Sequence, residues 1–363
     1  MHSACRERDT TRDVIAARAL PGVGDVGLAL RMAECGSARA LLSTLSHVER
    51  ERAYRDADAL VASVAAIGAF TLTRDDEAYP PGLMELHDAP AILFGQGALA
   101  TAAGPAVAIV GTRAASSYGL RVARAIATTC ARAGVAVISG LAQGIDGAAH
   151  EAALQAGGRT VAVLGTGLDI VFPRQHRALQ AHIAKDGLLL TELAPGVPGH
   201  GGTFPRRNRI IAALADITVV VEAGERSGAL ITANYAHTLD RRIACVPNAI
   251  DVPSSRGSNA LLKAYAEPIL APDDVLNMLD LRAAPTPAPL LDRDAAACWD
   301  AILRGATDLA SIAHLASLTT RAAATALTAL ELEGLVHVEV TGRIRSSISS
   351  VSASTGHGAA PRV

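Results

Sequence analysis

The chain has 363 residues, of which 50% are hydrophobic, 19% charged and 3% aromatic, and it carries a formal net charge of −2 with a pI near 6.6. This length leaves room for roughly two or three domains with sizeable cores. The near-neutral charge excludes a global basic field, so any nucleic-acid binding must depend on local patches. The scarcity of rings argues against a platform of many stacked aromatics.

The cysteines and the apolar runs exclude two further classes of protein. The five cysteines are Cys5, Cys35, Cys130, Cys245 and Cys298. None is spaced as a CxxC pair, so we expect neither a disulfide framework nor a metal site, and a reduced, cytoplasmic setting fits. Residues 1–13 are polar and charged, and no run reaches about 18 uninterrupted apolar residues, so we expect no membrane span and no membrane partner.

Residues 1–68 are predicted to form a small helical domain of the helix-hairpin-helix or SAM-like kind, with a loose tail at 1–12. Helices are expected over residues 13–20, from about 25 to 35, and over 47–68. The turn Leu20-Pro21-Gly22-Val23-Gly24 resembles turns that offer backbone N–H groups to a DNA phosphate. A plain tight turn between two helices is the commoner arrangement, and we favour it.

Residues 69–280 are predicted to form an α/β core, a doubly wound Rossmann-like parallel sheet. Short apolar runs alternate there with helical patterns, as expected when parallel strands are buried on both faces. The runs lie at 106–110, 135–139, 160–164, 188–190, 217–221 and 243–246. Before them, Phe70–Thr73 is expected as a short strand and Ala91–Phe94 as a strand at the sheet edge.

The loops that follow these strands are rich in glycine, and in doubly wound folds the ligand binds at the carboxyl ends of the strands. The candidate binding residues in the first two loops are Gly111, Thr112, Arg113, Ser139, Gly140, Gln143 and Gly144. No Gly-x-Gly-x-x-Gly fingerprint follows the first strand and no Walker A motif is present, so we expect no dinucleotide or other cofactor.

The stretch Thr203–Ile211 concentrates positive charge at the predicted start of a helix. Arg206, Arg207 and Arg209 lie where the helix dipole is already positive, so they repel one another unless an anion is near. Free N–H groups beside arginine side chains suit a phosphate. A solvated basic turn explains this stretch, taken alone, equally well.

The pattern Phe-Pro-Arg-x-x-Arg occurs twice, at 172–177 and 204–209, each time before a predicted helix. A purely structural interpretation is a Phe staple with Pro in the first helical turn. The functional interpretation, slightly favoured, is a pair of phosphate sites with stacking rings, which suits an extended polyanion better than a mononucleotide. It adds the candidates Phe172, Arg174, Phe204, Arg206, Arg207, Asn208 and Arg209.

The C-terminal part begins with a Pro/Ala-rich linker at 281–291. Three predicted helices and a hairpin follow at 292–348, an arrangement that resembles a winged helix, and 349–363 is predicted to be a disordered tail. The third helix, at 319–333, contains one Arg and many Ala, which makes a poor reader of a DNA groove. A protein-contact role and a DNA-contact role both stay open for this domain.

Five motifs in a fixed order resemble the DNA-processing protein A (DprA/Smf) family over about residues 70–275. They are Ala108-Ile109-Val110-Gly111-Thr112-Arg113 with Ser117-Tyr118-Gly119; Ser139-Gly140-Leu141-Ala142-Gln143-Gly144-Ile145-Asp146 with Ala149-His150; Val161-Ala162-Val163-Leu164-Gly165-Thr166-Gly167-Leu168-Asp169 with Phe172-Pro173; Phe204-Pro205-Arg206-Arg207-Asn208-Arg209-Ile210-Ile211; and Val221-Glu222-Ala223 with Ser227-Gly228-Ala229-Leu230-Ile231-Thr232.

The resemblance implies a protein that binds single-stranded DNA without sequence preference, forms a homodimer and delivers the strand to the RecA recombinase in natural transformation. It implies no catalytic residues and no enzymatic activity. By the same resemblance Arg113 is the DNA-contacting arginine of the first loop, and Arg174 occupies a position that is often basic. Arg206, Asn208 and Arg209 match the family's Pro-x-Arg-Asn-Arg signature.

Two other functions compete with this one. Phosphoribohydrolases that process nucleotides have a related fold, and Gly201-Gly202-Thr203 faintly resembles their motif. However, Phe204–Ile210 lacks the expected Glu, and the carboxylates Asp146, Glu192 and Glu222 show no paired acid/base spacing. A regulator of double-stranded DNA acting through the C-terminal domain is disfavoured by the Ala-rich third helix.

Overall fold

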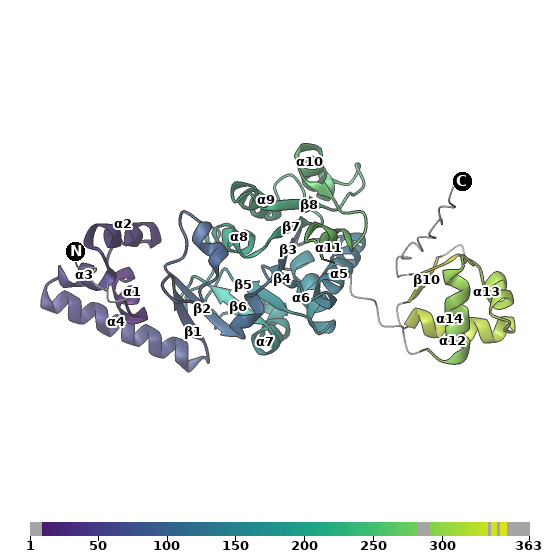
Figure 1. Ribbon diagram of the computed structural model, residues 1–363, viewed down its shortest axis with the longest axis horizontal. Coiled ribbons are helices and arrows are strands. Elements are labelled where there is room, and N and C mark those ends of the chain that lie inside the picture. The colour runs from purple at the N-terminus through teal and green to yellow at the C-terminus, as the bar shows by residue number, and fades with distance from the viewer. Residues whose placement is uncertain (1–8, 282–290, 333–334, 340–341, 347–363) are drawn as a thin grey trace, which may run out of the picture. The chain divides into compact units, whose positions relative to one another are not determined.

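The computed structural model describes residues 9–281, 291–332, 335–339 and 342–346, and the chain divides into two compact units, Met1–Ala284 and Pro285–Val363. The first unit contains helices α1–α11 and the large sheet, and the second contains α12–α14 and a small sheet (Figure 1). Most of the predicted tail at 1–12, nearly all of the predicted linker and the predicted tail at 349–363 lie outside the described residues.

The N-terminal helices are α1 (Thr11–Arg18), α2 (Asp25–Cys35), α3 (Ala38–Ser43) and α4 (His47–Ala66). Capping boxes start two of them, Thr10 with Asp13 at α1 and Ser46 with Glu49 at α4. The first box explains why α1 begins two residues inside the predicted tail. The short helix α3 was not predicted.

The turn between α1 and α2 is tied into the packing of these helices. The side chain of Val23 is buried, and its carbonyl accepts a hydrogen bond of 2.6 Å from Arg18 Nη1. Gly22 has a φ of +73°, which a glycine adopts without strain. Contacts inside the N-terminal domain therefore fix the conformation of this turn.

The described residues of the first unit form a nine-stranded sheet in the order β1-β2-β6-β5-β4-β3-β7-β8-β9. The strands are β1 Phe70–Thr73, β2 Ile92–Gly97, β3 Ala106–Val110, β4 Ala136–Ser139, β5 Thr160–Val163, β6 Leu188–Thr191, β7 Ile217–Val220, β8 Arg242–Cys245 and β9 Glu267–Pro268. The seven neighbouring strands from β3 to β9 run parallel to one another, and on β3 Ala108 lies opposite both Ile138 of β4 and Thr218 of β7. The predicted mixed α/β fold with a large, mostly parallel sheet is confirmed, although β2 lies one strand inside the edge because β1 pairs outside it.

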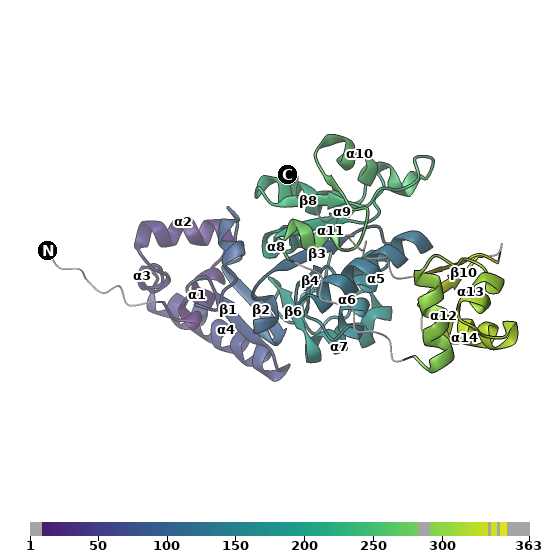
Figure 2. The same ribbon diagram turned by 45° about the vertical axis from the view of Figure 1, so that its right-hand side comes forward.

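Helices cover both faces of this sheet. They are α5 Ser117–Arg132, α6 Ile145–Gln155, α7 Arg177–Asp186, α8 Thr203–Leu214, α9 Gly228–Thr238, α10 Arg256–Ala264 and α11 Asp274–Met278, with 3₁₀ turns η1 Pro81–Glu85, η2 Leu99–Ala102, η3 Arg174–His176 and η4 Pro253–Ser255. Figures 1 and 2 show α8 and α9 on one face and α5 and α6 on the other.

The central strand β3 shows how its sequence produces this layering. Ala106, Ala108 and Val110 pack into the core that includes α8 and α9, whereas Val107 and Ile109 pack into the core under α5 and α6. Side chains alternate between faces along a strand, so an unbroken apolar run buries both faces. The parallel strands could be predicted closely for this reason.

The order of strands reverses beside β3. The chain proceeds outward from β3 through β4 and β5 to β6, and then returns to place β7 on the other side of β3. The loops after β3 and β7 therefore lead to opposite faces and leave a crevice at the carboxyl ends of the two strands, where doubly wound folds bind ligands.

The second unit contains α12 (Arg293–Leu303), α13 (Leu309–Leu315), α14 (Thr320–Leu332) and the antiparallel strands β10 (Val336–Val338) and β11 (Ile344–Ser346). Their apolar faces share a small core that includes Cys298, Ile312 and Leu330. In the ranges that the structure describes, no helix of either unit combines the length and the apolar character needed to cross a membrane.

Candidate nucleic-acid interface

A cavity of about 920 Å³ opens at the point where the strand order reverses. Its walls are the loop after β3, the first turns of α8 and the 224–229 loop that leads from β7 into α9, together with Ser254. The predicted candidates that line it are Gly111, Thr112, Arg113, Phe172, Phe204, Arg207 and Asn208. The structure thus brings together residues from three separate stretches of the sequence.

Two exposed arginines on different walls give the cavity its positive charge. Arg113 follows β3 and Arg226 follows β7, and within the described ranges neither guanidinium forms an ion pair. The N-terminus of α9 also faces the cavity through Gly228 and Ala229. Free guanidinium groups and a helix N-terminus favour an anion.

Sequence reasoning missed Arg226, although a signal existed. The loop after the fifth parallel strand also follows a strand carboxyl end, but no binding candidate was taken from it. The rule that ligands bind at strand carboxyl ends applies to the whole of that loop. Arg226 therefore belongs with Arg113 as a candidate.

Two aromatic rings stand at the rim. The centroids of Phe172 and Phe204 are 4.9 Å apart with a 37° angle between the rings, and Arg113 lies 5.9 Å from the Phe204 centroid. Phe172 is 46% exposed, so it offers a free face to a planar group. The two Phe-Pro-Arg-x-x-Arg segments meet at these rings.

The position of the Phe204 ring depends on two glycines. A Cβ atom at Gly165 would lie 2.6 Å from Phe204 Cδ1, and one at Gly199 would lie 2.7 Å from Phe204 Cζ. Because carbon atoms cannot approach so closely, any other residue at either position would displace the ring or the loop.

Arg207 is buried in the wall, and hydrogen bonds from its guanidinium hold the sheet edge together. Nη1 donates to the carbonyls of Gly140, at 2.8 Å, and Val163, while Nε donates to Asn208 Oδ1 at 3.2 Å. Burial lowers the pKa of Arg207 to about 10, although Asp146 opposes this change. The residue stays cationic at neutral pH and fixes the ends of β4 and β5.

The remaining predicted residues of the second loop shape the rim without lining the cavity. Ser139 is buried and donates to the Ile109 carbonyl at 2.6 Å, and Gly140 packs against the Arg207 guanidinium. Gly144 has a φ of +78° and lies against the Thr112 carbonyl, so it must be glycine. Gln143 and, in η3, Arg174 are exposed outside the cavity.

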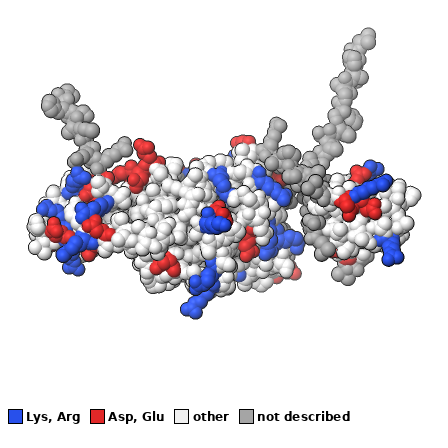
Figure 3. All heavy atoms as spheres, turned by 90° about the horizontal axis from the view of Figure 1, so that it is seen from below, with Lys and Arg blue, Asp and Glu red and all other residues white. Residues whose placement is uncertain are grey.

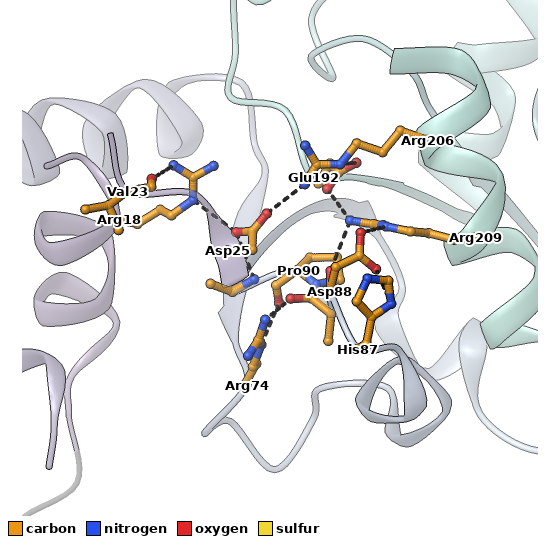
Figure 4. Close-up of polar contacts among 12 residues, drawn as sticks. Arg18, Val23, Asp25, Arg74, His87, Asp88, Pro90, Glu192, Arg206 and Arg209 are labelled. Atoms are coloured by element: carbon orange, nitrogen blue, oxygen red, sulfur yellow. Dashed lines mark hydrogen bonds and ion pairs between the residues drawn. The ribbon is translucent and has the colours of Figure 1, made fainter. Parts of the chain in front are cut away.

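Arg206 and Arg209 lie on another face of α8, where protein carboxylates supply the anions that the basic cluster requires (Figure 4). Arg209 is 1% exposed and pairs with Asp88 at 2.8 Å and Glu192 at 2.7 Å. Arg206 pairs with Asp25 at 3.0 Å and Glu192 at 3.5 Å. The sequence alone did not reveal these partners.

The buried carboxylate of Glu222 joins the loops around the cavity. It accepts hydrogen bonds from the Ser116 amide at 3.1 Å, the Ser116 hydroxyl at 2.7 Å and the Ser254 hydroxyl at 2.5 Å. Its backbone carbonyl also accepts from the Thr112 amide at 2.7 Å. In the part of the chain that the structure describes, no three His, Cys, Asp or Glu side chains gather as a metal site requires.

These features define a Rossmann-like α/β protein with a cavity suited to an anionic ligand that carries a planar ring. The chain belongs to the DNA recombination-mediator protein A family, whose family model matches residues 70–280. The resemblance drawn from the five motifs is thereby confirmed.

Individual relatives support this assignment. Protein Smf of Synechocystis sp. is 42% identical over 226 residues, which cover 61% of this chain and 55% of the relative. The chain spans about half the length of the first curated relatives it matches.

Solved structures show the same fold. DNA processing protein A from Streptococcus pneumoniae is 31% identical with a TM-score of 0.66, covering 75% of this chain and 98% of that protein. DNA processing protein A from Helicobacter pylori, whose structure was described for its single-stranded DNA binding mode, is 29% identical with a TM-score of 0.54, covering 59% of this chain and 97% of that protein.

Proposed function

We propose that the cavity between β3 and β7 binds single-stranded DNA without sequence preference, and that this binding serves DNA processing in transformation. The observation that carries the proposal is that Arg113 and Arg226, whose guanidinium groups form no ion pair with any described residue, line the same cavity as an exposed ring, Phe172. The binding mode named for the Helicobacter pylori relative and the family assignment support it.

Each part of the site has a distinct proposed role. Arg113 and Arg226 neutralise phosphates, with help from the backbone of Gly111 and from the N-terminus of α9. Phe172 stacks on a base, and Arg174 extends the contact outside the cavity. Phosphates and π-faces are common to every nucleotide, so these contacts carry no sequence information.

A pair of substitutions tests this assignment. We expect Arg113→Ala and Arg226→Ala each to lower single-strand affinity by about tenfold, the value of a hydrogen bond to a charged group. Each should also reduce the slope of log K against log salt by about 0.7, because one phosphate contact is lost. Fluorescence anisotropy measures both quantities.

The matched control is Arg132→Ala, which removes an exposed arginine from the last turn of α5, far from the carboxyl edge of the sheet. We expect this variant to bind like the wild type. Unchanged affinity in both Arg113→Ala and Arg226→Ala would contradict the proposed contacts.

The roles of the outer segments and partners extend the proposal. We propose that α1–α4 form a helix-hairpin-helix or SAM-like domain and that residues 292–348 form a winged helix. The protein is proposed to act in the cytoplasm as a homodimer that loads RecA on the strand. RecA filament assembly on a coated single strand, measured with and without this protein, tests the loading role.

We propose a binding role for this cavity and no catalytic one. The carboxylates considered for catalysis have structural partners, since Glu192 pairs with two arginines and Glu222 accepts from two serines. Asp146 accepts from the amides of Gly140 and Ala142. Release of ribose phosphate from AMP would instead support the phosphoribohydrolase alternative.

A further inference from the structure

Helix α8 divides its basic motif between two faces. Phe204, Arg207, Asn208 and Ile211 line the cavity, at the spacing of one helical face. Arg206 and Arg209 lie three residues apart, so they share a different face. The carboxylates that they contact come from outside the cavity.

The second face belongs to a chain of alternating charges that crosses from the N-terminal helices to the core (Figure 4). The successive pairs are Arg18–Asp25 at 3.0 Å, Asp25–Arg206 at 3.0 Å, Arg206–Glu192 at 3.5 Å, Glu192–Arg209 at 2.7 Å and Arg209–Asp88 at 2.8 Å. Arg18 ends α1, Asp25 begins α2, and Glu192 follows β6. Asp25 Oδ1 also accepts from the Ala91 amide at 3.3 Å.

Burial makes this chain sensitive to the loss of any member. Asp25 is 9% exposed and Glu192 is 11% exposed, so neither carboxylate can turn fully to water. Removing one partner of a buried pair leaves an uncompensated charge, which the structure relieves by moving. Arg206 is half exposed and connects Asp25 with Glu192. Its ion pairs can therefore be removed without creating a cavity in the hydrophobic core.

We propose that Arg206 and Arg209 are positioning residues, and that the docking of α1 and α2 on α8 through Asp25 and Arg206 sets the affinity of the cavity for its ligand. The inference rests on the proposed function of that cavity. When Arg206 holds Asp25, the first turn of α8 is fixed, and with it Phe204 and Arg207. When the contact is broken, the start of α8 becomes free to shift.

A positioning role and a direct phosphate contact predict opposite changes of affinity when Asp25 is neutralised. If Arg206 bound DNA itself, Asp25 would compete with the phosphate, so Asp25→Asn would raise the affinity. If Arg206 positions α8, Asp25→Asn weakens binding just as Arg206→Gln does. The two variants therefore separate the roles, and neither residue lines the cavity.

The experiment measures single-strand affinity of the full chain over a salt titration for wild type, Asp25→Asn, Arg206→Gln and the double variant. We expect each single variant to lose about three- to tenfold in affinity, the range of coupling through such networks, with the salt slope unchanged. The double variant should lose no more than either single one, because both open the same contact. Hydrogen exchange should increase in α8 and stay unchanged in β3–β5.

The control variant is Asp58→Asn, which removes the exposed Arg12–Asp58 pair within the N-terminal helices. It should bind like the wild type. A gain of affinity in Asp25→Asn, a salt slope reduced by about 0.7 in Arg206→Gln, or unchanged affinity in both would overturn the inference. Failure of the proposed function is distinguishable, since the wild type would then not bind, or Arg113→Ala and Arg226→Ala would both leave the affinity unchanged.

Discussion

At the scale of single residues, the same residue type serves different purposes according to burial. Arg113 and Arg226 are exposed and line the cavity, Arg207 is buried and holds the ends of β4 and β5, and Arg209 is buried against two carboxylates. An arginine motif therefore cannot be treated as one binding surface. Its members must be assigned one at a time from their partners.

His150 provides a prediction at this scale. The ring is fully buried with Nδ1 2.7 Å from Thr160 Oγ1, and desolvation, together with electrostatic effects of His176 and Arg207, lowers the pKa of His150 from 6.5 to about 3. Between pH 6.5 and about 3, His150 is therefore protonated in the unfolded chain and neutral in the folded chain. We expect His150 to lower the free energy of unfolding by about 1.4 kcal/mol per pH unit as the pH drops from 6.5 toward 3, and the contributions of other groups add to this.

Urea denaturation at several pH values measures this dependence. The variant His150→Gln should lose that component of the slope, whereas His47→Gln, at an exposed position on α4, should keep it. An identical pH dependence in wild type and His150→Gln would show that His150 does not resist protonation.

At the scale of elements, loops around β3 and α8 determine the geometry of the site. Glu222 ties α5, β7 and η4 together, while Gly165 and Gly199 leave the space in which the Phe204 ring lies. The site is thus shaped by backbone contacts that bring no functional group of their own. We expect substitutions in these loops to change ligand affinity by displacing the Phe204 ring.

Gly199 tests this statement. An alanine Cβ there would lie 2.7 Å from Phe204 Cζ and 2.9 Å from the Gly165 carbonyl, so Gly199→Ala should displace the ring and cost about 1–3 kcal/mol in stability. Single-strand affinity should fall with it. In the same loop, Gly201→Ala meets no atom within 4 Å and should leave the stability unchanged. Equal stability of the two variants, by thermal unfolding, would contradict the role of Gly199.

Elements were predictable from the sequence to different degrees. The parallel strands are unbroken apolar runs, and Ala106–Val110 matches β3 to the residue because both of its faces are buried. The partners of the basic motif were not predictable, since Asp25 lies 181 residues from Arg206 and Asp88 lies 121 residues from Arg209. Local periodicity carries no information on such distant pairs.

At the scale of the whole molecule, charge is distributed in small patches. On the face of the first unit drawn in Figure 3, Lys and Arg side chains are interspersed with Asp and Glu, in keeping with the net charge of −2. Without a broad basic field, long-range attraction to duplex DNA is weak, and binding depends on the cavity. We therefore expect the protein to prefer a flexible strand that can enter the cavity.

Fluorescence anisotropy over a salt titration, with a single strand of about 20 nucleotides and with its duplex, tests this preference. We expect tighter binding of the single strand, with a slope of log K against log salt of about −1.4 to −2.1 for two or three neutralised phosphates. Equal or tighter binding of the duplex, or an affinity independent of salt, would contradict it.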